Sequence, residues 1–289
     1  MIDEKNKVLK STLYLVATPI GNLADISERA IKVLSEVDFI AAEDTRNSVR
    51  LLHALGIKKE LVSYHEHNKK SSGERLVARL LSGESCALIT DAGMPAISDP
   101  GEDIVRLCAD AGITVSVIPG ACAAVSALSV SGLATSRFAF EGFLSANKGE
   151  RKKQLKKVKH EDRTLIFYEA PHKLKVTLGD MAEVFGGDRK ISLCRELTKL
   201  NEEIKRTTLA EAIAFYETFE PRGEYVLIVE GFSGEVVSEE KVELISLSPE
   251  EHVDKYIADG LSRMDAIKRA AKDRSMTKSQ LYKILNSEG

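Results

Sequence analysis

The chain has 289 residues, of which 43% are hydrophobic and 29% charged, and its formal net charge is −3. This length predicts about two domains, with enough apolar residues for a core that needs neither disulfides nor structural metals. The small net charge excludes binding of a polyanion through the overall field, so any nucleic-acid contact must come from local basic patches.

The amino terminus, residues 1–10, is charged and lacks the apolar core of a signal peptide, and no apolar run reaches the length of a membrane span. The four cysteines are scattered singly without a C-x-x-C pair, which favours neither a disulfide framework nor a zinc site. We therefore expect a cytoplasmic protein that makes no membrane contact.

The first part of the chain alternates apolar strands with helical patterns. Strands are predicted at residues 13–17, 39–42, 61–64, 87–89 and 115–118, with helical periodicity at residues 27–35 and 103–111. This alternation is typical of a parallel α/β layer. We place the end of this first domain, residues 1–134, in the link that follows a small-residue turn and helix at residues 119–127.

Three turns at predicted strand ends are rich in small residues, and they occupy residues 18–22, 93–101 and 119–123. In an open α/β sheet, ligands bind beyond the carboxyl ends of the strands, and small residues let backbone groups reach a ligand directly. A part-apolar ligand with a polar rim fits these turns better than a pyrophosphate, because the glycine spacing of a phosphate loop is missing. The alternative for each turn taken alone is a structural Gly/Pro turn.

The second part, residues 135–235, has more strands than helices. Strands are predicted at residues 138–144, 165–168, 191–195, 204–208 and 225–229, with only two good helices between them. Strands with so few crossover helices predict a mixed sheet, in a second α/β domain.

A basic stretch at residues 148–159 holds seven Lys/Arg residues and one Glu. Leu155 and Val158 give it a thin apolar stripe at helical spacing, so we expect a basic surface helix. The alternative is a solvated helix face that only balances acidic residues elsewhere.

The tail, residues 248–289, is predicted to form a separate three-helix module after an acidic, turn-rich segment at residues 233–247. Ser248, Ser262 and Thr277 each stand three residues before an acidic or amide side chain, which is the spacing of a helix cap. Buried faces are expected from Ala266, Ile267, Ala270 and Ala271 in the second helix and from Leu281, Ile284 and Leu285 in the third. With seven Lys/Arg and two Asp between residues 261 and 283, the module is typical of a helix-turn-helix (HTH) nucleic-acid binder, and a packing or dimerisation bundle is the alternative.

The chain lacks the sequence motifs of several common enzyme classes. No P-loop, dinucleotide-binding G-x-G-x-x-G, G-x-S-x-G nucleophile turn or H-E-x-x-H zinc motif occurs. His65 and His67 stand two residues apart, but the sequence offers no third ligand beside them. We therefore expect a polar surface at these histidines and no metal.

Five motifs together resemble the ribosomal small-subunit RNA methyltransferase I family of the tetrapyrrole methylase superfamily. They are residues 18–27 (TPIGNLADIS), 42–46 (AEDTR), 91–101 (DAGMPAISDPG), 167–172 (FYEAPH) and 194–199 (CRELTK). The resemblance covers nearly the whole chain and implies two α/β domains with a cofactor cleft between them, followed by the helical tail. It also implies S-adenosylmethionine as cofactor, a homodimer, and 2′-O-methylation of a cytidine in the decoding region of 16S rRNA in the small ribosomal subunit.

The resemblance further implies which residues contact the cofactor. Where relatives carry Gly-Asp-Pro, this chain has Gly93, Met94 and Pro95, so contacts there are expected from the backbone and not from a carboxylate. The expected cofactor-binding residues are Pro19, Gly93, Met94, Pro95, Ala96, Ile97, Asp99, Ala121, Cys122, Ala123, Tyr168, Leu197 and Tyr225.

Methyl transfer to a ribose hydroxyl requires alignment of the hydroxyl and removal of its proton. Asp44 and Arg46, at the end of the second strand, are expected to position the substrate or handle that proton, and a local pair that closes the turn is the alternative. RNA contacts are expected from Lys152, Lys153, Lys156, Lys268, Arg269, Lys272 and Lys278. A small-molecule methyltransferase of the tetrapyrrole type has no need for these basic patches, and a nucleic-acid-binding regulator has no need for the cleft.

Overall fold

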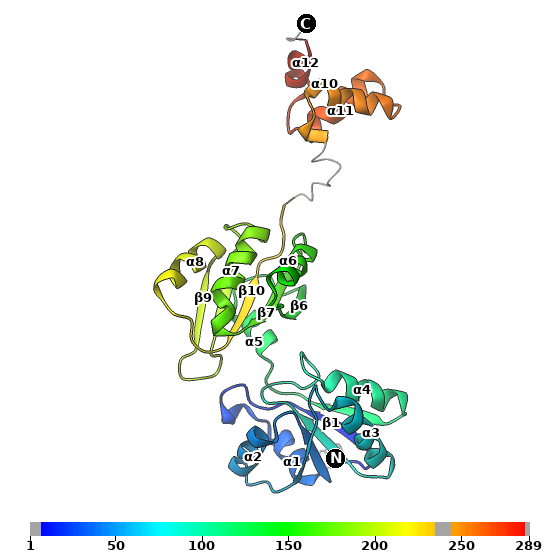
Figure 1. The fold of residues 1–289 in the computed structure, drawn as a ribbon, viewed down its shortest axis with the longest axis vertical. Coiled ribbons are helices and arrows are strands. Elements are labelled where there is room, and N and C mark those ends of the chain that lie inside the picture. The colour runs from blue at the N-terminus through cyan, green and yellow to red at the C-terminus, as the bar shows by residue number, and fades with distance from the viewer. Residues whose placement is uncertain (1–6, 235–243, 287–289) are drawn as a thin grey trace. The chain divides into compact units, whose positions relative to one another are not determined.

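The computed structural model describes residues 7–234 and 244–286 of the chain (Figure 1). The chain forms two compact units, Met1–Phe232 and Ser233–Gly289. The first unit contains two five-stranded sheets, and the domain boundary proposed near Ala134 falls between them. The acidic segment expected before the tail lies largely outside the described residues, as does the start of the charged amino terminus.

The first sheet is wholly parallel. Its strands are β1 (Thr12–Val16), β2 (Phe39–Ala42), β3 (Glu60–Ser63), β4 (Cys86–Ile89) and β5 (Thr114–Ile118), in the order β3-β2-β4-β1-β5. β2 and β4 are buried along their whole length, as is usual for strands covered by helices on both faces. The five predicted strands are confirmed to within one residue at each end.

Helices cover both faces of this sheet. They are α1 (Glu28–Glu36), α2 (Thr45–Ala54), α3 (Lys69–Leu81) and α4 (Gly101–Asp110), with a single 3₁₀ turn, η2, at Leu23–Asp25. Because successive strand residues point to opposite faces, Tyr14 packs with the side chains of α1 and α2, whereas Leu13 packs with those of α3 and α4. The loops that leave the carboxyl ends of the strands therefore all lie at one edge of a rigid layer.

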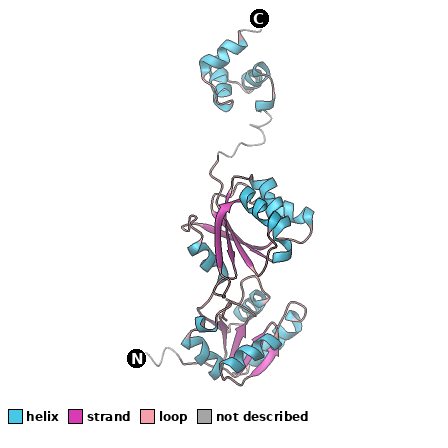
Figure 2. Cartoon of the chain, turned by 90° about the vertical axis from the view of Figure 1, so that its left-hand side faces the viewer, coloured by secondary structure: helices cyan, strands magenta, loops and turns pink. Residues whose placement is uncertain are grey.

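The second sheet is mixed, as predicted. Its strands are β6 (Phe138–Phe143), β7 (Thr164–Glu169), β8 (Lys190–Arg195), β9 (Glu203–Thr208) and β10 (Tyr225–Val229), in the order β6-β7-β10-β8-β9. β6 and β7 pair in parallel, and the other neighbours are antiparallel. Figure 2 shows strands of both sheets (magenta) with helices (cyan) packed beside them.

Three helices accompany this sheet, namely α6 (Lys148–Lys157), α7 (Pro171–Phe185) and α8 (Leu209–Thr218). The expectation of only two helices between these strands is wrong. α6 is the expected basic surface helix, but it buries only Arg151 and Leu155, so its apolar periodicity is weak. Two contacts join it to the rest of this half, namely Leu155 in the core and the ion pair between Arg151 and Asp180 of α7, whose side chains are both buried.

One helix that follows the first sheet in sequence packs on the second sheet. This helix, α5 (Ala123–Val130), begins five residues after β5 ends. Its residues Ala124, Ala127 and Leu128 are buried in a cluster with Ile166 of β7 and Val226 of β10. The chain therefore passes from one sheet to the other through the third small-residue turn.

The second unit is the predicted three-helix module, with α10 (Pro249–Ala258), α11 (Arg263–Asp273) and α12 (Lys278–Leu285). Ser248 and Thr277 form complete capping boxes, and the Ser262 hydroxyl accepts a hydrogen bond from the backbone N–H of Asp265, so all three predicted caps are confirmed. The predicted face of α11 and Leu281 of α12 form its core together with Val253 of α10, and Leu285 packs against it. Ile284, the third residue of the predicted α12 face, is half-buried. The core residues of α11 are Ala266, Ile267, Ala270 and Ala271.

None of the helices within residues 7–234 and 244–286 combines the length and apolar character that a membrane crossing requires. In the same residues, no three His, Cys, Asp or Glu side chains converge in a way that could hold a metal ion.

Candidate functional site

The principal pocket of the first unit lies where the carboxyl edge of the first sheet meets the second sheet, and its volume is about 480 Å³. This volume is within the usual range for small-molecule sites, about 300–1,000 Å³. Nine of the expected cofactor-binding residues line it, namely Gly93, Met94, Ile97, Asp99, Cys122, Ala123, Tyr168, Leu197 and Tyr225. The other four, Pro19, Pro95, Ala96 and Ala121, stand next to lining residues without lining the pocket themselves.

The first and second small-residue turns are joined through Thr18 and Gly93. The backbone N–H of each donates to the carbonyl of the other, at 2.9 and 3.0 Å. The Thr18 hydroxyl also donates to the carbonyl of Thr90, at 3.1 Å. Gly93 has a φ of 85°, and a Cβ added there would lie 3.2 Å from Ile20, so this contact requires glycine.

The second turn is held in shape by Asp99. Its Oδ1 atom accepts hydrogen bonds from the backbone N–H groups of Ala96 and Gly101, at 3.0 and 2.7 Å. Ala96 is in the left-handed region with a φ of 68°, a conformation that non-glycine residues rarely adopt. The N–H groups of Gly93 and Ala96 thus already donate hydrogen bonds within the protein. The backbone contacts expected for a ligand are therefore left to Met94 and Ile97.

The third turn contributes the first residues of α5. Cys122 is the N-cap residue of this helix, and its side chain makes no capping hydrogen bond. Cys122 and Ala123, the first residue of the helix, both line the pocket. The Tyr168 hydroxyl oxygen accepts a hydrogen bond from the N–H of Ala124, at 3.2 Å. Burial raises the pKa of Tyr168 to about 12, so its hydroxyl is neutral at physiological pH. A helix N-terminus with unpaired N–H groups favours a carboxylate or other anionic group.

Tyr225 contributes differently from Tyr168. Only 3% of its surface is exposed, and its hydroxyl oxygen accepts a 3.3 Å hydrogen bond from Tyr216. It therefore lines the pocket as a largely buried ring whose hydroxyl oxygen is already engaged by Tyr216. Phe143, which the sequence did not single out, lines the pocket with its ring packed edge-on against Tyr168 at a centroid distance of 5.4 Å.

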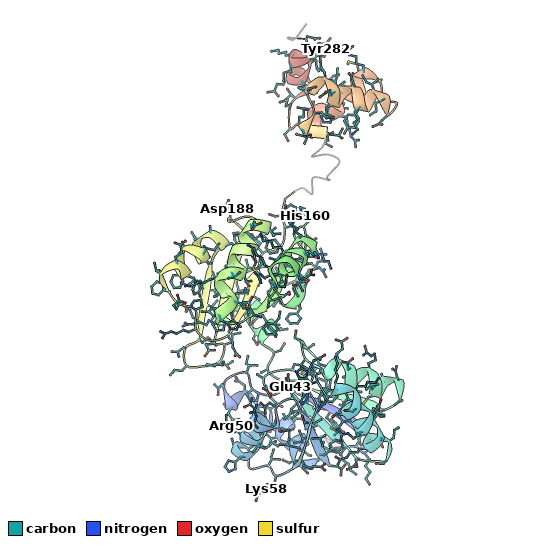
Figure 3. The ribbon with its side chains drawn as sticks, in the orientation of Figure 1. Glu43, Arg50, Lys58, His160, Asp188 and Tyr282 are labelled. Carbon is teal, nitrogen blue, oxygen red and sulfur yellow. The ribbon has the colours of Figure 1, made fainter. Side chains whose placement is uncertain are left out.

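Glu43 is the chemically most distinctive residue that the sequence interpretation missed. Glu43, labelled in Figure 3, directly follows β2 and lines the pocket. Its Oε2 atom accepts a 3.0 Å hydrogen bond from the Thr90 hydroxyl. Burial raises the pKa of Glu43 above the usual 4.5, and the nearby carboxyl groups of Asp91 and Asp99 add to this effect. The available signal was its position, since the residue after a parallel strand lies at the ligand-binding edge.

Asp44 and Arg46, the expected catalytic residues, do not line the pocket. Asp44 caps α2, and both of its carboxyl oxygens accept hydrogen bonds from the Arg46 guanidinium, at 3.1 and 2.7 Å. This partner holds the pKa of Asp44 at about 2. The pair therefore closes the turn at the start of α2, beside the pocket, and the side chain of Arg46 is 87% exposed.

Acidic side chains dominate the polar lining. Glu43, Asp91, Asp99, Glu169 and Glu224 line the pocket, and none of its lining residues is a lysine, arginine or histidine. Among the apolar lining residues are Ile20, Met94, Ile97, Phe143, Leu197 and Val226. Glu224 is paired with Lys199 at 2.8 Å. Because the other four acidic residues have no lysine or arginine beside them in the lining, the lining as a whole is negative. Such a site favours a ligand with a positively charged group and an apolar portion.

The two basic stretches differ in how their charges are compensated. On α6, Lys152 pairs with Glu183 at 2.6 Å and Lys153 pairs with Glu150 at 2.9 Å, whereas Lys156 is exposed. On the tail, four of the expected RNA-binding residues are exposed, namely Lys268, Arg269, Lys272 and Lys278. Among the described residues, none of these four forms an ion pair.

Comparison with known proteins places this fold and these motifs in one family. Residues 12–213 match the tetrapyrrole (corrin/porphyrin) methylases. The chain is 52% identical over 279 residues to ribosomal RNA small subunit methyltransferase I of Halalkalibacterium halodurans, covering 96% of both chains. It is 50% identical over 270 residues to the protein of the same name from Bacillus subtilis, covering 93% of this chain and 92% of that one.

Solved structures with low sequence identity share the fold. Uroporphyrin-III-C-methyltransferase from Thermus thermophilus superimposes with a TM-score of 0.55 at 21% identity, over 76% of this chain and 94% of that one. A diphthine synthase gives a TM-score of 0.58 at 16% identity, over 76% and 90% of the two chains.

Proposed function

Because the chain belongs to the tetrapyrrole methylases and, within them, to the ribosomal RNA small subunit methyltransferase I family, we propose that it methylates the ribose 2′-oxygen of a cytidine in 16S rRNA. The methyl donor is S-adenosylmethionine, and the substrate is the small ribosomal subunit. The observation that carries this proposal is the single pocket at which all three small-residue turns meet. We further propose that the enzyme is a cytoplasmic homodimer.

The pocket lining fits this methyl donor. S-adenosylmethionine supplies, when bound, a methyl group on a positively charged sulfonium. The acidic lining suits that charge, the apolar residues suit an adenine ring, and the start of α5 suits a carboxylate. We propose that seven residues hold the donor, namely Gly93, Met94, Ile97, Cys122, Ala123, Tyr168 and Leu197. Asp99 keeps the second turn in shape, and the buried ring of Tyr225 forms part of the pocket wall.

Glu43 is the residue that we propose accepts the proton of the ribose hydroxyl. A hydroxyl is a poor nucleophile until its proton is removed, and a base works best when its pKa lies near the working pH. The raised pKa of Glu43 moves it toward this condition, whereas the pKa of Asp44, at about 2, makes that carboxylate a weak base. The Thr90 hydroxyl keeps the Glu43 carboxylate in place.

Arg46 is proposed to position the RNA. Its guanidinium is exposed beside the pocket and is oriented by both oxygens of Asp44. A guanidinium held in this way can contact an RNA phosphate. In this arrangement Asp44 orients Arg46 and takes no part in proton transfer.

The tail is proposed to make further contacts to the RNA. Its exposed Lys268, Arg269, Lys272 and Lys278 are uncompensated by ion pairs in the described part of the chain, whereas Lys152 and Lys153 on α6 are paired. Releasing counterions from RNA requires uncompensated cations, so the tail contributes more to affinity than α6 does.

The test is to incubate the purified chain with labelled S-adenosylmethionine and small subunits that lack the modification, and to map the labelled nucleotide. We expect one labelled cytidine that carries the methyl group on its ribose. A label on a base, or transfer to a uroporphyrin-type tetrapyrrole in place of RNA, contradicts the proposal.

A second measurement tests the tail. Removal of residues 248–289 should weaken binding of the subunit and flatten its dependence on salt, while the affinity for S-adenosylmethionine is retained. Unchanged methylation of subunits by the shortened chain contradicts the role of the tail.

A further inference from the structure

A hollow of about 440 Å³ lies on the tail between α11 and α12, and we call it the α11–α12 hollow. It is lined by Met264 of α11 and by Lys278, Ser279 and Tyr282 of α12. Met264 is 56% exposed and Tyr282 is 51% exposed, although Leu281 beside Tyr282 is fully buried. Figure 3 shows Tyr282 at the surface of the helical module.

Tyr282 contacts no described residue through a hydrogen bond or a ring pair that explains its position. In the part of the chain that the structure describes, its hydroxyl makes no hydrogen bond and its ring packs against no other aromatic ring. An exposed tyrosine ring with an adjacent thioether presents a flat, polarisable surface. Such a surface suits a planar ligand that can stack on it.

Cations flank this surface on both helices. Lys278 lies one helical turn before Tyr282, and Lys268 lies one turn after Met264, so each is a neighbour of an apolar residue on the same helix face. Both lysines are exposed and form no ion pair with a described residue. A ligand with a planar group for Tyr282 and Met264, and with a negative charge on each side for Lys278 and Lys268, matches these side chains.

We propose that the α11–α12 hollow binds an unpaired nucleobase of the substrate RNA, which stacks on Tyr282 while Lys278 and Lys268 contact the flanking phosphates. This inference rests on the proposed function and specifies the part of the RNA that the tail contacts. Single-stranded nucleic acids are commonly bound by an aromatic side chain for the base with basic residues along the backbone. Lysine is depleted at protein interfaces relative to the rest of the surface, so the two flanking lysines favour a nucleic acid over a protein partner.

The test uses the full chain and measures, by fluorescence anisotropy, its affinity for a labelled single-stranded oligocytidine and for an RNA duplex of equal length. We expect tighter binding of the single strand. Tyr282→Ala should weaken single-strand binding about 5- to 100-fold, the effect of losing one stacked base. Tyr282→Phe should retain it, because the ring and not the hydroxyl carries the contact.

Two control variants separate this effect from general changes of the surface. Phe219→Ala removes an exposed ring, 56% exposed, from the first unit and should not change RNA affinity. Lys278→Gln should reduce the salt dependence of binding by about one phosphate contact, whereas Lys58→Gln, an exposed lysine after α2, should not.

The following outcomes overturn the inference: equal affinities of Tyr282→Ala and Phe219→Ala, an equal loss in Tyr282→Phe and Tyr282→Ala, or no RNA binding by the unaltered chain. A change of oligomeric state in Tyr282→Ala, measured by sedimentation, also overturns it and assigns the hollow to a second copy of the chain. Site-specific methylation of subunits by the unaltered chain tests the proposed function separately, so either proposal can fail alone.

Discussion

Glu43 and Thr90 directly follow two paired strands, β2 and β4, and the Thr90 hydroxyl donates a 3.0 Å hydrogen bond to the Glu43 carboxylate. If Glu43 is the proton acceptor, Glu43→Gln should lower the rate of methyl transfer about 10²- to 10⁴-fold. The rate of the unaltered enzyme should rise with pH through a pKa above 4.5, because only the deprotonated carboxyl accepts a proton. Single-turnover rates across pH measure both effects, with Glu36→Gln, an exposed residue of α1, as the control.

Glu43→Gln should lower the rate of methyl transfer without lowering the stability of the protein. Because the folded-state pKa of Glu43 is raised, its ionisation disfavours the folded state, and this cost develops as pH rises from the ordinary pKa to the raised one. Glu43→Gln should therefore leave the melting temperature at neutral pH equal or slightly higher. A clear fall in melting temperature together with loss of activity would show that Glu43 serves structure and not catalysis.

Arg46→Gln should raise the KM for subunits by roughly tenfold or less, the weight of a single phosphate contact, while the affinity for S-adenosylmethionine is unchanged. The reason is that Arg46 is exposed beside the pocket and does not line it. Steady-state kinetics with varied subunit concentration provide the measurement, and Arg50→Gln, also exposed on α2, is the control. A lower kcat with an unchanged KM would instead assign Arg46 to the chemical step.

Ala123→Trp should weaken binding of S-adenosylmethionine about 100-fold or more, because an indole at the start of α5 fills the pocket. Val125→Trp is the matched control, since this residue of the same helix is 52% exposed and does not line the pocket. Calorimetric titration measures both variants. Equal affinities in the two variants would show that the third turn does not contact the methyl donor.

The tail should lose stability in mild acid because of His252. Its fully buried ring accepts a 3.0 Å hydrogen bond from Arg274 at Nδ1. Among the described residues Nε2 makes no hydrogen bond, and the Asp273 carboxylate lies 3.7 Å from it. Burial and the charges of Arg274 and Lys255 lower the pKa of His252, and Asp273 opposes them only in part. A histidine with a lowered pKa contributes stability that is complete above the ordinary value of 6.5 and is lost as pH falls below it.

Amide hydrogen exchange over α10–α12, corrected for the intrinsic effect of pH, measures this change between about pH 7.5 and about pH 5.5. Protection should fall in the tail as pH is lowered and should not fall in the first sheet. His53→Gln, an exposed residue of α2, should leave the result unaltered. Equal protection of the tail at both pH values would contradict the assignment.

The sequence predicted the strands better than the helices of the second sheet, for a physical reason. β2 and β4 are buried on both faces, so each is a continuous apolar run that turns interrupt on either side. α6 was expected as a basic helix, but its apolar stripe is thin and its buried ion pair of Arg151 with Asp180 has no signature in hydrophobic periodicity, so it was not counted among the helices that separate the strands. The caps of the tail were predictable because they depend on residues only three positions apart.

From residue patterns alone, the pocket was predictable only on the side that the strand-end turns form, whereas Tyr168, Leu197 and Tyr225 on the other side were expected from the family resemblance. Gly93, Met94 and Ile97 were expected from their turn, but Phe143 and Glu169 end two strands of the second sheet, and Glu224 directly precedes β10. Their place in the pocket depends on how two sheets far apart in sequence meet, which no local pattern encodes. The sequence interpretation chose Asp44 and not Glu43, because position at a strand end does not show which of two neighbouring side chains, pointing in different directions, faces a ligand.

The packing of α5 has a consequence for how the two halves of the first unit depend on each other. Ala123 is carried by a helix whose buried residues lie in the core of the second sheet, whereas Gly93 and Met94 belong to the loops of the first sheet. A molecule held by all three acts as a crosslink between two separately built cores. Binding of the donor then stabilises both cores. A substitution that loosens the packing of α5 on the second sheet should therefore lower the affinity for the donor, even where the substituted residue does not line the pocket.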